Sequence, residues 1–264
     1  MFEELDILYG RLQSIRPLSP ESVRRLSEDF MIDYTYNSNA IEGSTLTLEE
    51  TALVLKEGVT VGGKPLKHHL EAIGHRDAYY YVEDFVKNKA PVSERVIKDI
   101  HSLVLMDRQM DKGVYRSVPV RVGAFHPCQP FEVPVQMERL MIDYAGEMQE
   151  FHVIERAAVF HLRFETIHPF IDGNGRVGRL LLNLELMKAG LPPVNVKLTD
   201  RERYYGCFNH YRENNGDASK LTTLIGEYAV YELKRYIEIA MQADTLRNAH
   251  PEDFCSEGEN GYGQ

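Results

Sequence analysis

The stretch from Ile167 to Arg179, IHPFIDGNGRVGR, constrains the fold more than any other part of the chain. The residues before it, 154–167, have the apolar spacing of a helix, and so do residues 176–189 after it. A glycine and a proline pair then follow as a helix stop signal. Gly173 and Gly175 must therefore turn the chain tightly between two helices and lead directly into the second.

This turn has the backbone and side chains of an anion site. Two glycines allow successive N–H groups to point into one concavity, which forms a nest for an anion. The helix that follows adds its unpaired N–H groups and about half a positive charge. Arg176 and Arg179 are three residues apart and project from one side of the first turn. Guanidinium groups there suit phosphate oxygens well.

The remaining polar groups of the stretch also fit a phosphate site. Asp172 would repel an anion unless a cation lies between them, and Mg²⁺ is usually held by one carboxylate plus phosphate oxygens. His168 lies one turn before the nest, where an imidazole can accept a proton from an incoming hydroxyl group. A nest, cationic clamps, a metal ligand and a base together are typical of phosphoryl or nucleotidyl transfer.

The glycine spacing has other interpretations. Gly173, Gly175 and Gly178 satisfy G-x-G-x-x-G, but that dinucleotide fingerprint follows a strand, and here a helical pattern precedes it. The acidic residue expected about 20 positions later is absent, since residues 192–196 read PPVNV. A P-loop is excluded because no Gly-Lys-Ser/Thr follows. A plain helix–loop–helix turn would explain two glycines, but not the clustered His, Asp, Asn and two Arg.

From His168 to Arg179 the chain matches H-x-F-x-[D/E]-G-N-G-R-x-x-R at every defined position, and so resembles the Fic family. The resemblance extends to Gly113-Val114-Tyr115-Arg116 and covers roughly residues 95–240. Fic proteins are mostly helical, and most with the full motif transfer AMP from ATP to a Ser, Thr or Tyr hydroxyl of a target protein. Doc-like kinases and phosphocholine-transferring relatives depart from this pattern around the loop.

The resemblance implies a role for each motif residue. His168 would be the base that takes the proton of the target hydroxyl, Phe170 would anchor the loop, and Asp172 would hold Mg²⁺. The ATP phosphates would be bound by Gly173, Asn174, Gly175, Arg176 and Arg179. Of these, the three residues from 173 to 175 would form the anion hole. The first arginine would contact the phosphates near the leaving group, and the second would hold the γ-phosphate.

A second motif lies far upstream. Residues 38–43 read SNAIEG and resemble the inhibitory pattern [S/T]-x-x-x-E-[G/N] of autoinhibited Fic proteins, with Ser38, Glu42 and Gly43 at its defined positions. A glutamate in the last turn of a helix invites a cationic partner, because the helix end is already partly negative. If Glu42 pairs bidentately with Arg179, that arginine cannot hold a γ-phosphate. The motif thus predicts autoinhibition by Glu42.

The rest of the chain predicts an all-α fold, a Fic-type helical domain with a short β-hairpin flap and an N-terminal helical extension. We expect helices at approximately residues 19–40, 47–58, 66–87, 93–106, 134–148, 154–167, 176–189 and 218–241, and one after Thr199. Ser19, Thr47 and Thr199 are the expected caps. We divide the chain into the extension (1–92), which carries the inhibitory helix, a Fic core (93–243) and a flexible tail (244–264).

Two further parts of the site are expected. Between Tyr115 and Pro134, valines alternate and four prolines limit the segment to an edge hairpin. Such an edge can dock an extended target segment by β-augmentation, and the residues expected to do so are Val118, Val120 and Val122. In the family, a residue of the helix after Thr199 often borders the adenine. The candidates for that role are Tyr204, Tyr205 and Asn209.

Composition limits the partners. A net charge of −10 argues against a dedicated nucleic-acid binder, and no apolar stretch is long enough to span a membrane. Three scattered cysteines and an acidic N-terminus predict a cytoplasmic location rather than secretion. The expected partners are ATP as co-substrate, Mg²⁺, and a target protein with an accessible hydroxyl group, which the chain itself can supply. A homo-oligomer is left open.

Two alternative functions also stay open. The same site can remove AMP if Glu42 orients a water molecule against a modified target. The chain can also be a regulatory ATP-binding module that transfers nothing.

Overall fold

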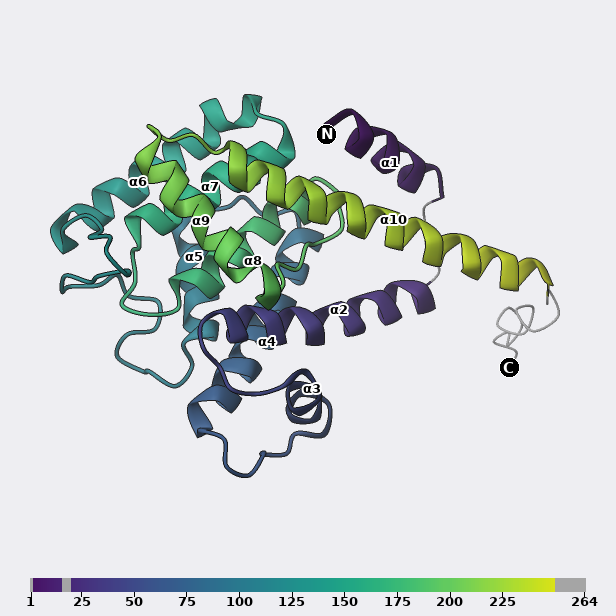
Figure 1. The fold of residues 1–264 in the computed structure, drawn as a ribbon, viewed down its shortest axis with the longest axis horizontal. Helices are drawn as coiled ribbons and strands as arrows, with labels where there is room; N and C mark the ends of the chain where they lie inside the picture. Colours follow the sequence, from purple (N-terminus) through teal and green to yellow (C-terminus); the bar gives the residue numbers. More distant parts are fainter. Residues whose placement is uncertain (1, 16–19, 250–264) are drawn as a thin grey trace, which may run out of the picture.

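The computed structural model describes residues 2–15 and 20–249. Within these ranges the chain forms α-helices and short 3₁₀ turns and no strand, which confirms the all-helical fold (Figure 1). The helices are α1 (Phe2–Ile15), α2 (Pro20–Ile41), α3 (Leu48–Glu57), α4 (Leu66–Lys87), α5 (Glu94–Val104), α6 (Val133–Ala145), α7 (Val153–Ile167), α8 (Asn174–Lys188), α9 (Arg201–Glu213) and α10 (Ser219–Ala249). The 3₁₀ turns are η1 (Pro130–Glu132), η2 (Glu147–Glu150) and η3 (Leu198–Asp200).

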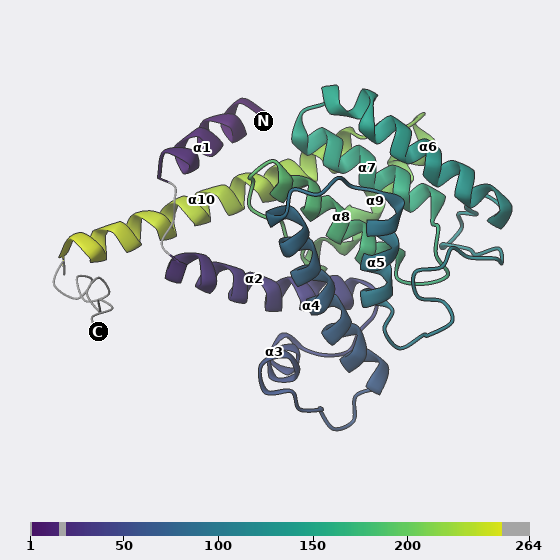
Figure 2. The ribbon, with the colours of Figure 1, turned by 180° about the vertical axis from the view of Figure 1, so that it is seen from behind.

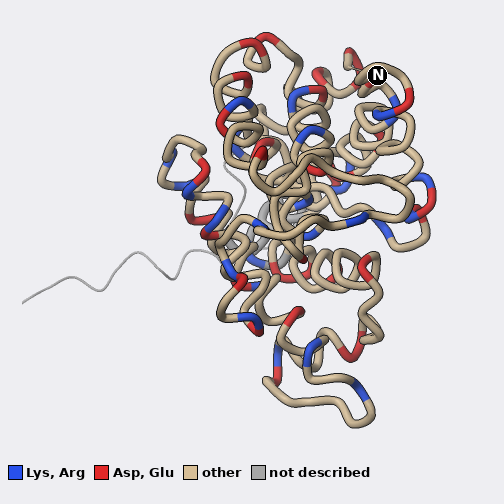
Figure 3. The backbone as a smooth tube through the Cα atoms, turned by 90° about the vertical axis from the view of Figure 1, so that its left-hand side faces the viewer, with Lys and Arg blue, Asp and Glu red and all other residues tan. Residues whose placement is uncertain are grey.

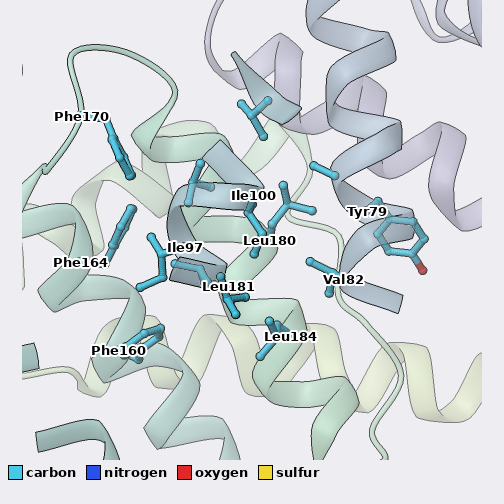
Figure 4. Close-up of a cluster of buried hydrophobic side chains, with 14 of the residues drawn as sticks. Tyr79, Val82, Ile97, Ile100, Phe160, Phe164, Phe170, Leu180, Leu181 and Leu184 are labelled. Carbon is cyan, nitrogen blue, oxygen red and sulfur yellow. The ribbon is translucent and has the colours of Figure 1, made fainter. Parts of the chain in front are cut away.

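Helix α8 lies at the centre of the molecule. Nearly all of its residues are buried, as expected for a helix that is apolar on most sides. Leu180, Leu181 and Leu184 face one core cluster, in which they meet residues of α4, α5 and α7 (Figure 4). Leu182 and Leu186 face a second cluster with residues of α1, α9 and α10. The first turn of α8, which opens the candidate site, is therefore fixed from two sides.

Helix α10 extends from this body, and α1 packs along it (Figures 1 and 2). The expected helices do not include α1. Leu5 and Leu12, two turns apart on it, are buried in the second cluster and explain why it forms. The expected tail from residue 244 is wrong as far as Ala249, because α10 continues to that residue. The rest of the predicted tail and the expected cap Ser19 lie outside the described residues.

The two predicted capping boxes differ in outcome. Thr47 and Glu50 form the expected reciprocal pair at the start of α3, with side-chain to backbone bonds of 2.8 and 3.1 Å. The box at Thr199 is wrong, because that residue lies inside η3 and α9 begins only at residue 201. Asp200 precedes α9, but its carboxylate accepts a hydrogen bond from Tyr228 instead of capping the helix. A tertiary contact has replaced the local one.

The flap is reduced to the tip of a hairpin. Val122 and Phe125 form an isolated antiparallel bridge around Gly123, whose φ of 60° requires a left-handed conformation. Val118 and Val120 belong to no strand. The prolines on either side remove the backbone donors that a longer ladder needs.

Charged residues of both signs are spread along the part of the chain that is visible in Figure 3. Lys and Arg alternate with Asp and Glu along the visible elements (Figure 3). Among the described helices, none has the length and apolar character needed to cross a membrane.

Candidate functional site

The loop between α7 and α8 has two left-handed residues that shape it. His168 ends α7 with φ 50° and ψ 61°, and its N–H still bonds to the carbonyl oxygen of Phe164. Gly173 precedes α8 with φ 79° and ψ 0°, as a glycine can without strain. The chain therefore leaves one helix and enters the next within a few residues, with the imidazole close to the start of α8.

Asn174 holds this loop closed. Its Oδ1 accepts the N–H of Phe170 at 2.9 Å, and its Nδ2 donates to the carbonyl oxygen of the same residue at 2.8 Å. The side chain is buried, with 2% of its surface exposed. It was expected to help form the anion hole, but both ends of its amide are occupied. Only its backbone N–H is left to contact an anion.

A buried arginine braces the same loop from the flap. Arg116 donates from Nε to the carbonyl oxygen of His168 at 2.8 Å and from Nη2 to that of Cys128 at 2.6 Å. Its backbone N–H bonds to the carbonyl oxygen of Pro169 at 2.9 Å. The sequence had marked this residue only as part of the motif before the flap. The structure adds a positioning role.

Sequence reasoning missed His101 on α5. Its ring stacks on Phe170 with centroids 3.7 Å apart and an interplanar angle of 4°. Nδ1 accepts the N–H of Gly113 at 2.8 Å, so the proton is on Nε2, which lies 3.1 Å from the carbonyl oxygen of Asp172. Burial lowers the pKa of His101 to about 4, and the ring is neutral near pH 7. No spacing in the sequence indicated these contacts.

Asp172 is surrounded by cations. Its Oδ2 lies 3.6 Å from Lys67 and 3.5 Å from Arg108, and its Oδ1 lies 3.3 Å from Arg176. Burial raises the pKa of Asp172, but Arg176, Lys67, the N–H of Gly173 and Arg108 outweigh it, and the net pKa is lowered. The side chain is 30% exposed. The carboxylate is thus ionised and reachable, as a ligand for a hard cation must be.

Arg176 turns away from the helix end and toward α4. Its Nη1 lies 2.9 Å from Oε1 of Glu71, and the side chain is only 2% exposed. Nothing in the sequence had singled out Glu71. The expected contact of Arg176 with phosphates is not available in this arrangement, because the guanidinium is enclosed by Glu71 and Asp172.

Arg179 is held by both ends of the inhibitory motif. Its Nε donates to Oγ of Ser38 at 3.0 Å, and its Nη2 donates to the carbonyl oxygen of Ser38 at 2.7 Å and to Oε1 of Glu42 at 2.9 Å. The expected bidentate pair is wrong, because a single carboxylate oxygen makes the contact. The motif serine accepts from Nε and Nη2, and Nη1 donates to the hydroxyl of Tyr204 at 3.5 Å. Gly43 follows with φ 97° and ends the helix, as a glycine in that position allows.

The Glu42 carboxylate lies against the first turn of α8. A Cβ at Gly175 would collide with Oε1 of Glu42 and lie 3.2 Å from Nη1 of Arg179. Only glycine leaves room for the carboxylate there. The unpaired N–H groups of the first helical turn favour any anion at this point. The acid therefore stands where the sequence predicted a phosphate.

A pocket of about 680 Å³, a volume suited to a nucleotide, lies at the first turn of α8. His168, Gly175, Arg179 and Glu42 line it, together with residues 122–125 of the flap tip. Asp172, Asn174 and Arg176 are not part of its lining. The structure thus brings the predicted base, one glycine of the nest and one arginine to the same cavity as the inhibitory glutamate.

The three adenine candidates differ. Tyr204 lines the pocket but is only 1% exposed, and its hydroxyl lies 2.6 Å from Nε2 of His161, so it presents little surface to a base. Tyr205 lines the pocket, and its hydroxyl lies 3.4 Å from the carbonyl oxygen of Ile41. Asn209 also lines it and accepts a hydrogen bond from Arg212 at 2.6 Å. All three candidates line the pocket, and Tyr205 and Asn209 are more exposed than Tyr204.

Of the flap valines, Val122 lines the pocket, and Val118 and Val120 do not. The guanidinium of Arg212 lies 4.4 Å from the ring centroid of Phe125 and ties the flap tip to α9.

Within residues 2–15 and 20–249, no three His, Cys, Asp or Glu side chains converge as a metal site. The single carboxylate of Asp172 fits Mg²⁺ that arrives with phosphate oxygens as further ligands.

Comparison with known proteins points in one direction. Residues 91–186 match the family model of the Fic/DOC family. Protein adenylyltransferase fic-1 of Caenorhabditis elegans is 33% identical over 86% of this chain and 46% of its own length. Protein adenylyltransferase Fic of Nematostella vectensis is 35% identical over 82% of this chain and 51% of its own. The chain spans about half the length of the curated relatives it matches.

Solved structures show the same architecture. A Fic domain containing signaling protein from Bacteroides thetaiotaomicron superposes with a TM-score of 0.84 and 28% identity, over 90% of this chain and 97% of that one. Residues 134–508 of Fic-1 from C. elegans superpose with a TM-score of 0.80 and 29% identity, over 92% and 73% of the two chains. The similarity thus extends well beyond the segment that the family model matches.

Proposed function

Because the chain carries a domain of the Fic/DOC family, we propose that it transfers AMP from ATP to a Ser, Thr or Tyr hydroxyl of a target protein and that Glu42 inhibits this activity. The observation that carries the proposal is the position of Glu42. Its carboxylate lies at the N-terminal turn of α8, in the same pocket as His168, and is paired with Arg179. An acid held at an anion site beside a base is what an inhibited phosphate-binding enzyme requires.

The reaction follows from the chemistry of the lining. With Glu42 displaced, Arg179 and the first-turn N–H groups of α8 bind the phosphates and leave the α-phosphorus near His168. The imidazole takes the proton of the target hydroxyl while the hydroxyl oxygen forms its bond to the α-phosphorus. The bond to the β-phosphate then breaks, and pyrophosphate leaves with the electron pair. Mg²⁺ held by Asp172 would neutralise phosphate charge when bound.

The flap supports target binding at the mouth of the pocket. Val122 lines the cavity, and residues 118–121 belong to no strand in the described structure. The carbonyl oxygen of Val118 accepts from Nη1 of Arg116 at 3.4 Å, and the backbone groups of Val120 are open to an extended segment. We infer that Val118, Val120 and Val122 dock the target beside His168.

The reaction is tested with ATP labelled at either the α- or the γ-phosphate, using the Glu42→Gly variant as the released enzyme. We expect label from the α position alone to enter protein, and Glu42→Gly/His168→Ala to incorporate none. Incorporation of the γ label would identify a kinase and contradict the proposal.

A second assay separates transfer from removal of AMP. If Glu42 orients a water molecule instead, the wild type should strip AMP from pre-modified protein and Glu42→Gly should lose that activity. Nucleotide binding that survives His168→Ala, with no label incorporated by any variant, would indicate a regulatory ATP-binding module.

A further inference from the structure

His168 has a carboxylate neighbour that no motif accounts for. Glu165 lies three residues earlier on α7, and its Oε2 is 3.4 Å from Nδ1 of His168. The two side chains are 12% and 16% exposed and line the same pocket. A carboxylate beside one ring nitrogen of a histidine favours the proton on that nitrogen and leaves the lone pair on the other.

The environment of the ring gives the pair a direction. Nδ1 of His168 is buried and has no other partner. The described residues make no hydrogen bond to Nε2, so this nitrogen is left for a molecule in the pocket. The ring therefore presents Nδ1 to Glu165 and Nε2 to the pocket.

We propose that Glu165 is a positioning residue that holds His168 as the Nδ1–H tautomer, with Nε2 aimed into the pocket as the proton acceptor. The proposal rests on the proposed function, in which this histidine takes the hydroxyl proton. In the transfer step, that proton moves to Nε2 as the new oxygen–phosphorus bond forms and pyrophosphate leaves. Glu165 stays ionised, stabilises the imidazolium, and the proton passes to solvent after the product leaves.

Gly178, in α8, leaves room for the ring of His161 and for this carboxylate. A Cβ at Gly178 would collide with the ring of His161 and lie 2.9 Å from Oε1 of Glu165. The motif leaves position 178 undefined, so the motif alone does not require a glycine there. Oε1 of Glu165 is buried and has no hydrogen-bond partner. Among the described residues, His168 is the only group that pairs with this carboxylate.

The first test measures turnover in the Glu42→Gly background. Glu165→Gln keeps the shape and removes the charge, and we expect a loss of about 10- to 100-fold in kcat with KM for ATP within about twofold. Glu155→Gln, on the same helix and away from the pocket, is the matched control and should match the parent. A kcat of Glu165→Gln within about twofold of the parent would overturn the proposal.

The second test does not depend on turnover. Nitrogen NMR of ¹⁵N-histidine-labelled protein, with His168→Ala to assign the signal, reports which ring nitrogen carries the proton. We expect Nδ1–H in the wild type and a shift toward Nε2–H in Glu165→Gln; a wild-type proton on Nε2 would overturn the inference. If no variant transfers AMP, the proposed function fails while the tautomer still decides this proposal.

A second variant guards against misfolding. Should Glu165→Gln melt at a lower temperature than the parent by circular dichroism, Glu165→Asp, which keeps the charge on a shorter side chain, is measured beside it. We expect Glu165→Asp to retain more activity than Glu165→Gln. A lower rate for Glu165→Asp would contradict a role for the charge.

Discussion

The carboxylate of Glu42 and a phosphate group would compete for one position beside Gly175. The carboxylate of Glu42 fits only because residue 175 has no side chain, and the helix end that accepts it accepts a phosphate by the same N–H groups. A 100-fold preference for the inhibited state corresponds to about 2.7 kcal/mol. One partly shielded ion pair and the serine contacts of Arg179 are of that order.

Asn174 gives a prediction for loop stability. Asn174→Ala removes both bonds to Phe170 and leaves its buried N–H and carbonyl groups without these partners. We expect the free energy of unfolding in urea to fall by about 1–3 kcal/mol. Asn88→Ala, at an exposed helix end, is the control and should change it by less than about 0.5 kcal/mol. An unchanged free energy for Asn174→Ala would show that the loop does not depend on the amide.

At the scale of single residues, His168, Gly175 and Arg179 of the glycine-rich motif line one cavity with Glu42 of the upstream motif. The motif could not show that the side-chain amide of Asn174 bonds to the backbone of Phe170 within the loop. It also could not reveal the contacts of His101 and Arg116 with the loop, or of Glu71 with Arg176 in the first turn of α8. These contacts depend on how whole helices pack against one another, and a local sequence pattern does not predict such packing.

Helix α2 ends directly before the inhibitory residue Glu42, and polar contacts attach it to the segment before α9 and to the first residue of α9. Oδ1 of Asn37 accepts the N–H of Leu198 at 2.9 Å, and Arg201 donates to the carbonyl oxygen of Ile41 at 2.8 Å. Asp33 pairs with Lys197 beside them. Polar contacts of this kind lose less on separation than an apolar face does, because water replaces them.

This attachment predicts partial activation when it is weakened. Asn37→Leu leaves the N–H of Leu198 without its acceptor, so we expect α2 to exchange its amide hydrogens faster and AMP incorporation to rise by a few-fold, less than in Glu42→Gly. Glu28→Gln, on the exposed side of α2, should behave as the wild type. Faster exchange in α2 without any rise in rate would show that loosening the helix does not release Glu42.

Helix positions followed from the sequence where local signals decide them. Helix α3 begins after the capping box at Thr47 and ends at the left-handed Gly58, as expected. The start of α9 did not follow, since Asp200 bonds to Tyr228 on α10. The flap shows the same limit, because proline positions predict an edge but not how few residues of it pair.

On the scale of the whole molecule, three buried histidines link stability to pH. Burial lowers the pKa of His161 to about 3 and of His101 to about 4, and it lowers that of His75 well below its usual value. Each ring is neutral in the folded chain and titrates near pH 6.5 when unfolded. The unfolded chain therefore binds more protons below pH 6.5, and stability must fall as the pH falls through that range.

We expect the free energy of unfolding to be lower at pH 5 than at pH 8, with His161 alone contributing about 2 kcal/mol to the difference. His161→Gln should reduce the pH dependence by that amount, and His126→Gln, at an exposed position of the flap, should not. Urea unfolding at both pH values measures this. If the free energy of unfolding changes between pH 5 and pH 8 by the same amount in His161→Gln as in the wild type, the lowered pKa is contradicted.

Inhibition by Glu42 is tested most directly by one rate comparison. The initial rate of AMP incorporation into protein is measured at saturating ATP and Mg²⁺ for the wild type and for Glu42→Gly, with Glu57→Gly at the end of α3 as the control. We predict a rate at least about tenfold higher for Glu42→Gly, and a wild-type rate for the control. Equal rates for the wild type and Glu42→Gly would contradict the account.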